Sequence, residues 1–141
     1  MLRFVLLYHD CPPNYGRTSH WDFMLESGDV LRTWALETLP CDWRVVHART
    51  AVAHPNCSPV AGENVVAALQ LGNHRLDYLE LEGPLSDDRG TVTRVAAGTY
   101  SSEHEAADEW RVTLASVELS GRTWLSRTKT DGEQWILRTE Y

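Results

Sequence analysis

The sequence predicts an all-β protein, a small antiparallel β-barrel of about eight strands with long loops and at most a short helix. Short runs of alternating apolar and polar residues recur along the chain, and turn-forming residues separate them. The six tryptophans and five tyrosines, many of them in such runs, favour half-buried pleated surfaces. With 141 residues and 43% hydrophobic content, the chain fits one domain spanning residues 1–141.

The first part of the chain contains three strand candidates. Residues 2–8 form a compact apolar run that suits a buried strand. Residues 9–19 contain two prolines and a glycine, which predict a loop. Residues 20–25 and 30–36 alternate on either side of the turn formers at residues 26–29, so we expect a β-hairpin there.

The middle of the chain gives weaker patterns. Residues 42–52 are a further strand candidate, and residues 53–64 are rich in turn formers, which indicates a surface loop. Residues 65–71 form a short apolar run that fits either a strand or one buried helical turn. We favour the strand.

The region after residue 90 combines a strand pattern with a helical one. Residues 91–100 predict a strand with a turn at Gly98. The acidic residues 101–109 predict a short helix, because Ser101 or Ser102 suits its N-cap and acidic side chains favour a first helical turn.

The last forty residues carry the clearest strand signal. Residues 109–119, 122–130 and 133–140 alternate, and they are joined by Ser-Gly at 120–121 and Asp-Gly at 131–132. Three such runs predict an antiparallel meander.

Charge and cysteine content exclude several classes of protein. A formal net charge of −7 repels polyanions, so binding to nucleic acid requires a local basic or metal-bearing site. Cys11, Cys41 and Cys57 are odd in number and show no CxxC spacing, which argues against a disulfide framework or a zinc knuckle. Reduced thiols indicate a cytoplasmic protein. No apolar run is long enough to cross a membrane, so we expect no membrane partner.

His20 and Asp22 form the most informative local pattern. Side chains two residues apart on a strand share a face, so both can bind one ion. His9 follows the first strand candidate and is placed to join them if the loop returns His20 beside it. Two imidazoles and one carboxylate suit manganese, zinc or iron. The alternative is that these are ordinary hydrogen-bonded histidines.

These residues belong to a longer pattern, “YHD” followed by “HWDFMLESGDVLRTWAL”. It resembles the 3′-phosphoesterase domain of bacterial DNA ligase D, in which His-Asp precedes His-aromatic-Asp-Phe-Arg-Leu-Glu and Leu-x-Ser-Trp-Ala. The resemblance continues through “NHRLDYLELEG” at 73–83, “RGTVTRVAAGTY” at 89–100, “VTLASVELSGRTWLSR” at 112–127 and “QWILR” at 134–138. It therefore spans nearly the whole chain.

The resemblance implies roles for five residues. The family's manganese ligands carry over to His9, His20 and Asp22, with manganese as the expected metal and zinc as the alternative. The family's phosphate-site histidine and tyrosine carry over to His74 and Tyr78. The alternatives are that His74 is an ordinary loop residue and that Tyr78 is an aromatic residue of the core.

The chain departs from the family pattern at Met24, where the family has an arginine that would grip the phosphate. Arg17, in the loop before His20, is the candidate replacement. We therefore expect it at the phosphate together with His74 and Tyr78. The basic residues that precede the later histidine in the family are also missing. We therefore expect a weakened phosphate site that Met24→Arg would improve.

The implied function is that of a metal-dependent 3′-phosphoesterase in DNA repair. It would remove a 3′-phosphate or a 3′-terminal ribonucleotide from a DNA or RNA end, and separately encoded ligase or polymerase partners would use the clean end. One alternative is a weakened or non-catalytic metal-binding barrel that binds another ligand or protein. The other is a hydrolase of small phosphate esters.

Overall fold

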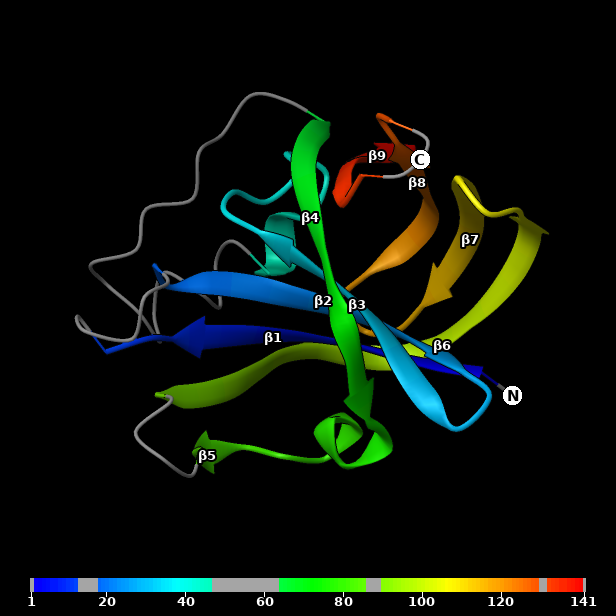
Figure 1. The fold of residues 1–141 in the computed structure, drawn as a ribbon. Helices are drawn as coiled ribbons and strands as arrows, with labels where there is room; N and C mark the ends of the chain where they lie inside the picture. Colours follow the sequence, from blue (N-terminus) through cyan, green and yellow to red (C-terminus); the bar gives the residue numbers. More distant parts are fainter. Residues whose placement is uncertain (1, 13–17, 47–63, 86–89, 130–131, 141) are drawn as a thin grey trace.

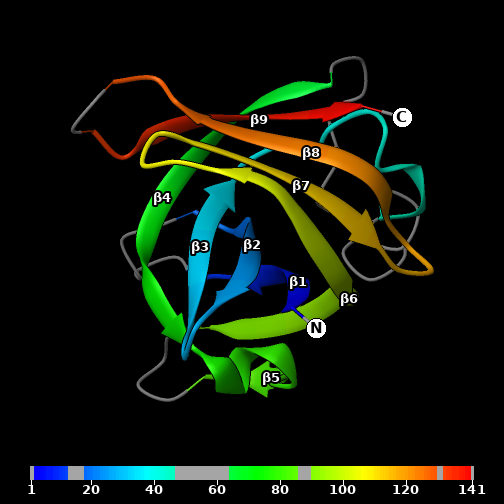
Figure 2. The ribbon, with the colours of Figure 1, turned by 90° about the vertical axis from the view of Figure 1, so that its right-hand side faces the viewer.

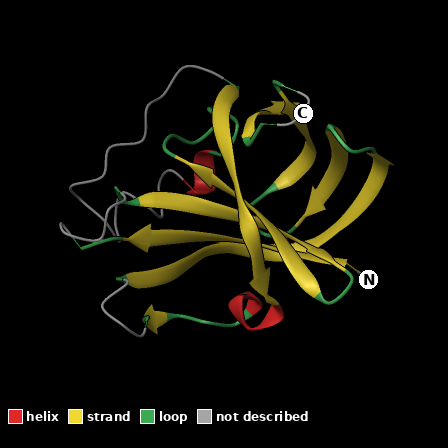
Figure 3. Cartoon of the chain, viewed as in Figure 1, coloured by secondary structure: helices red, strands yellow, loops and turns green. Residues whose placement is uncertain are grey.

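The chain forms one antiparallel sheet that closes on itself. The computed structural model describes residues 2–12, 18–46, 64–85, 90–129 and 132–140. Its elements are β1 (Leu2–Asp10), β2 (His20–Ser27), β3 (Val30–Leu36), β4 (Val65–Arg75), the 3-10 turn η1 (Leu76–Leu79), β5 (Gly83–Pro84), β6 (Thr91–Glu105), β7 (Glu109–Ala115), β8 (Ser120–Arg127) and β9 (Gln134–Glu140). Strands dominate the described residues, as Figure 3 shows.

Eight of the nine strands make a closed barrel. The hydrogen-bonded order is β1-β2-β3-β4-β9-β8-β7-β6, and a further pairing between β1 and β6 closes the ring. In Figure 1, β1 lies between β2 and β6. Figure 2 shows the ring nearly end-on, with η1 and β5 outside it. The predicted fold class is confirmed, including the strands favoured at residues 2–8, 20–25, 30–36 and 65–71.

Alternate residues of each strand fill the barrel, as a period of two requires. On β1, the side chains of Phe4, Leu6 and Tyr8 belong to the large core, whereas those of Val5 and Leu7 belong to a second, smaller cluster. The strand is apolar on both faces because both are covered.

Aromatic rings dominate the large core. Five of the six tryptophans are among the largest fully buried side chains. Trp34 meets both Trp110 and Trp135 edge to face, with ring centroids 6.1 and 5.5 Å apart. Such pairs add about 0.5–1.5 kcal/mol each beyond the burial of their area.

The second cluster lies on the outer face of the barrel, under η1. Its buried members, which we call the outer cluster, are Val5, Leu7, Met24, Leu31, Tyr78, Leu79 and Val92. Because residues two apart share a face of a strand, this face continues on β1 to His9 and on β2 to Asp22 and His20. The outer cluster therefore borders the residues predicted to bind a metal.

The strand expected at residues 42–52 is wrong in its described part, because residues 44–46 are helical. Trp43 and Val46 are both buried in the large core. A spacing of three places them on one side of a helical turn, whereas on a strand they would face opposite sides. The rest of this segment, and almost all of the loop expected at 53–64, lies outside the described residues. No helix in the described part of the chain is long and apolar enough to span a membrane.

The turn expected at Gly98 and the helix expected at residues 101–109 are also wrong, because β6 runs through Gly98 to Glu105 and β7 begins at Glu109. A Cβ atom at Gly98 would lie 2.4 Å from the Ala115 carbonyl oxygen, so the missing side chain allows β6 to pass close to the end of β7. Beyond it, β7 offers the acidic segment a ladder of hydrogen bonds, which outweighs local helix preference. Ser102 accepts a hydrogen bond from Trp110 Nε1 at 2.9 Å and caps no helix.

The C-terminal meander is confirmed, with one shift in a turn. The β7–β8 turn lies at residues 116–119, where the Ser116 amide donates to the Leu119 carbonyl at 2.9 Å. Ser120 and Gly121, expected as the turn, are already paired in β8.

Candidate functional site

Two histidines face each other where β1 ends and β2 begins. His9 is the cross-strand partner of His20, and their ring centroids are 5.1 Å apart. Asp22 shares their face, with Oδ1 3.0 Å from His20 Nε2 and Oδ2 3.7 Å from His9 Nδ1. The structure thus brings together the three side chains expected to bind a metal.

A backbone contact fixes the His20 ring. Nδ1 lies 2.8 Å from the Thr18 carbonyl oxygen. Since a carbonyl only accepts, Nδ1 is the donor, and in the neutral ring Nε2 then carries the lone pair. Metal-bound histidines commonly have this arrangement, with the other ring nitrogen donating to a carbonyl.

Asp22 is a buried carboxylate, with a side chain only 4% exposed. Burial by itself raises the pKa of Asp22, but the neighbouring His20 and His9 favour the ionised form and hold the pKa below its usual value. Oδ1 lies 3.0 Å from His20 Nε2. In the neutral tautomer set by the Thr18 contact, Nε2 carries a lone pair, so Nε2 and Oδ1 are both able to bind one divalent cation.

An irregularity in the β3–β4 ladder brings His74 to the same pocket. The register shifts between Leu31 and Thr33, and Leu31, a member of the outer cluster, pairs with His74. Such bulges commonly re-aim side chains near functional sites. The ring is held by a 2.9 Å contact between Nδ1 and the Gly72 carbonyl oxygen. A pocket of about 400 Å³ is lined by His9, His20, Asp22, Leu71, Gly72, Asn73 and His74.

Tyr78 packs against His74 from η1. The two rings meet nearly at right angles, with centroids 5.1 Å apart. Tyr78 is 8% exposed and belongs to the outer cluster. The structure therefore pairs the two residues expected at the phosphate, while the contact of either with a phosphate stays a prediction.

Met24 lies on the same face of β2 as His20 and Asp22, as expected. Its side chain is fully buried in the outer cluster, next to Asp22. Contact of this position with a phosphate stays a prediction. Arg17, the expected substitute for the family arginine, lies outside the described residues.

Cys11 is a residue that the sequence analysis missed. Its Sγ and ring nitrogens of His9 and His20 all lie within 4.8 Å of one another. Because no second cysteine lies at CxxC spacing from Cys11, it was not assigned as a ligand from the sequence. The signal was present in His9-Asp10-Cys11, because residues two apart at a strand end face the same way, as do His20 and Asp22.

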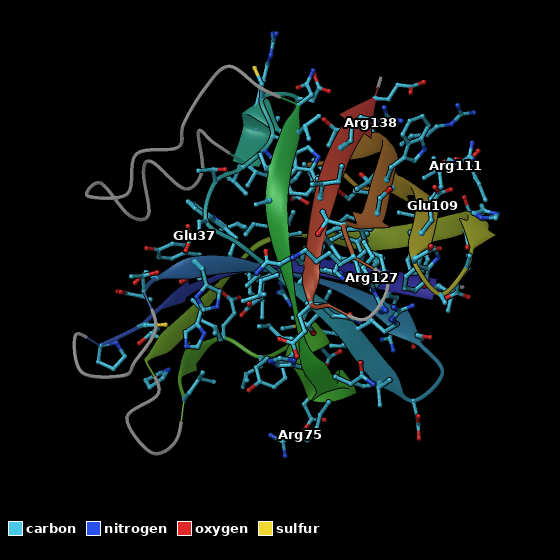
Figure 4. All side chains as sticks on the ribbon, turned by 45° about the horizontal axis from the view of Figure 1, so that its top comes forward. Glu37, Arg75, Glu109, Arg111, Arg127 and Arg138 are labelled. Atoms are coloured by element: carbon cyan, nitrogen blue, oxygen red, sulfur yellow. The ribbon has the colours of Figure 1, made fainter. Side chains whose placement is uncertain are left out.

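The surroundings of the site are weakly basic at most. A second pocket of about 540 Å³ adjoins His20 and is lined by Thr18, Ala35, Glu37, Thr38, Ala67, Leu69 and Gln134. Among the described residues, neither pocket is lined by an arginine or a lysine. Figure 4 shows Arg111 and Arg138 close together on β7 and β9, apart from Glu37, which lies at the second pocket. Among the residues described as lining the two pockets, the histidines are the ones able to carry a positive charge.

A comparison with known protein families agrees with this geometry. The family model described as DNA Ligase D 3'-phosphoesterase domain matches residues 14–128. The match includes His20, Asp22, His74 and Tyr78, whereas His9 precedes its first residue. No curated protein matches the chain.

Proposed function

The chain belongs to the DNA ligase D 3′-phosphoesterase domain family, and we propose that it is a metal-dependent enzyme that cleans DNA or RNA 3′ ends during repair. The reaction would remove a 3′-phosphate or a 3′-terminal ribonucleotide and leave a 3′-hydroxyl. Its partners would be the nucleic-acid end and separately encoded ligases or polymerases. The cytoplasm is the proposed location.

One observation carries this proposal, namely the convergence of His9, His20 and Asp22 with His74 in one pocket. The first three offer two imidazoles and a carboxylate, a donor set that suits a divalent ion and leaves positions for water and substrate. Manganese is the proposed metal and zinc the alternative. When bound, the ion would polarise phosphoryl oxygens and orient the attacking water.

The protein's own groups have separate tasks in this proposal. Asp22 and the two histidines form the metal site. Strand pairing and the Thr18 contact hold them in position before the substrate binds. In its protonated form, His74 donates from Nε2 to the phosphate or protonates the leaving oxygen, since the contact between its Nδ1 and Gly72 orients the ring. Tyr78 packs against that ring and positions a phosphate oxygen.

The substrate class can be tested with three compounds, each presented to the metal-loaded protein. These are an oligonucleotide with a 3′-phosphate, the same oligonucleotide with a 3′-terminal ribonucleotide, and a small aryl phosphate. We expect kcat/KM to be highest on the oligonucleotides. Faster turnover of the small ester would favour a hydrolase of small phosphate esters. Binding of the oligonucleotides without any turnover would favour a binding module, for which the lack of described basic residues in the pocket lining is the supporting observation.

His74→Ala is expected to lower kcat on the 3′-phosphate oligonucleotide by roughly 10²–10⁴-fold, the usual contribution of a general acid or base. The free energy of unfolding should change by less than about 1 kcal/mol, because His74 is only partly buried. Activity assays and thermal melts of the same preparation measure both effects.

His104→Ala is the matched control, since His104 lies near the far end of β6 and contacts Glu109. It should retain wild-type activity. If His74→Ala melted much earlier while its folded fraction kept full activity, the role of His74 would be structural.

A further inference from the structure

Cys11 adds a sulfur atom to the pair of histidines at the site. Its Sγ and ring nitrogens of His9 and His20 lie within 4.8 Å of one another, and both histidines are buried. Cys11 is half-buried and forms no disulfide. Three donors of two types, one thiol and two imidazoles, therefore gather at the end of the β1–β2 ladder, beside Asp22.

Hydrogen bonds hold Cys11 in place without help from a metal. Its amide donates to Ser19 Oγ at 3.0 Å, and the Ser19 hydroxyl donates to Asp10 Oδ1 at 3.2 Å. These two bonds tie the end of β1 to the residue before β2. The Sγ atom contacts the His9 carbonyl at 3.9 Å, a length at which a thiol is held weakly. These hydrogen bonds place the Cys11 backbone at the end of β1, next to the residue that precedes β2.

The spacing of the donors suits a small ion. Ligand atoms on a tetrahedral zinc, at roughly 2.0–2.3 Å from the metal, lie about 3.3–3.8 Å apart. Asp22 Oδ1 lies 3.0 Å from His20 Nε2, slightly below this range, and Oδ2 lies 3.7 Å from His9 Nδ1, within it. The sulfur of Cys11 is within 4.8 Å of the histidine nitrogens, so a shift of roughly 1 Å brings it into this range.

We propose that Cys11 binds the metal together with His9 and His20, beside Asp22, so that the site prefers a thiophilic divalent ion such as Zn²⁺ over Mn²⁺. A thiolate is a soft ligand that selects zinc, whereas manganese prefers oxygen donors. Binding forms a sulfur–metal bond and releases the thiol proton to solvent. This inference rests on the proposed metal site and revises its metal, because with Cys11 as a further ligand zinc ranks above manganese, the reverse of the order that the family resemblance implies.

The test uses Co²⁺ as a spectroscopic stand-in for Zn²⁺, added to the metal-free full-length chain. The wild type should show visible d–d bands, which report binding, and an intense near-ultraviolet band from sulfur-to-cobalt charge transfer. Cys11→Ser should keep the d–d bands and lose the charge-transfer band. Its Zn²⁺ affinity should fall by at least the roughly 10–100-fold that an outer-shell partner is worth, with Mn²⁺ affinity nearly unchanged.

Cys41→Ser is the matched control, because Cys41 is also a half-buried thiol but is not part of the cluster. It should keep both bands. Cobalt binding without a charge-transfer band in the wild type, or a band that persists in Cys11→Ser, would overturn the role of Cys11 while leaving the three-ligand site intact. Absence of any d–d bands would overturn the sulfur ligand and the proposed metal site together. Phosphoesterase activity does not enter this test, so failure of the proposed reaction is a separate result.

Discussion

Replacing His20 by alanine is expected to lower the affinity for Mn²⁺ and Zn²⁺ by more than roughly 100-fold. Loss of a residue that only supports a ligand already costs about 10–100-fold, and His20 would be a ligand itself. It is also the residue that links the others, because it pairs with His9 across the strands and its Nε2 lies 3.0 Å from Asp22. Calorimetric titration of metal-free protein measures the change directly.

Thermal melts provide a second readout of the same loss. An ion present at about 100 times its Kd stabilises the folded protein by roughly 2.7 kcal/mol. This metal-induced rise in Tm should disappear in His20→Ala and persist in His104→Ala, whose exposed histidine lies near the far end of β6. Equal affinities in wild type and His20→Ala would refute the assignment of His20 as a ligand.

Met24→Arg is expected to destabilise the fold, by about 3 kcal/mol or more. Met24 is fully buried in the outer cluster among Leu31 and Tyr78. A guanidinium there would lose its hydration, and the carboxylate beside it on this face, Asp22, already contacts His20 and His9, so the buried charge would cost about 3–5 kcal/mol. For a domain of this size the change corresponds to a fall in Tm of roughly 10 °C.

Met24→Leu is the control, because an apolar side chain of similar volume usually costs less than about 1.5 kcal/mol. If Met24→Arg melted with the wild type, the side chain would reach solvent through the pocket. The expectation from sequence, a higher kcat/KM on 3′-phosphate ends, would then apply to the variant. Chemical denaturation and activity of both variants distinguish these outcomes.

Much of the barrel could be predicted from sequence because its strands repeat a local pattern. The β2–β3 hairpin and the three C-terminal strands alternate with period two, and that alternation is a property of the strand itself. The errors arose where contacts between segments distant in the sequence determine the secondary structure. Pairing with β7 turns the acidic segment 101–105 into strand, and burial of Trp43 and Val46 in one core makes a helical turn.

The residues of the candidate site likewise fall into those that local spacing places and those that long-range contacts place. Spacing within one strand was sufficient to place His20 and Asp22 on one face. The approach of His74 depends on a register shift in the β3–β4 ladder, which spacing alone does not reveal, and it was expected only from a family motif. Met24 shares a buried cluster with Tyr78 and Leu79 of η1, so alternation gave its face, whereas its burial depends on a segment distant in the sequence. Cys11 was missed because a single cysteine acquires meaning only beside the histidines that the fold assembles around it.

The central claim is that a metal held by His9, His20 and Asp22 enables this protein to hydrolyse 3′-terminal phosphates. The most direct measurement is release of inorganic phosphate from a 3′-phosphate oligonucleotide by chelator-treated protein before and after reloading with Mn²⁺ or Zn²⁺. We predict no release before reloading and restored release afterwards in the wild type, with His20→Ala inactive under both conditions. Folded wild-type protein that binds the metal and releases no phosphate, or His20→Ala that matches the wild type, would contradict the claim.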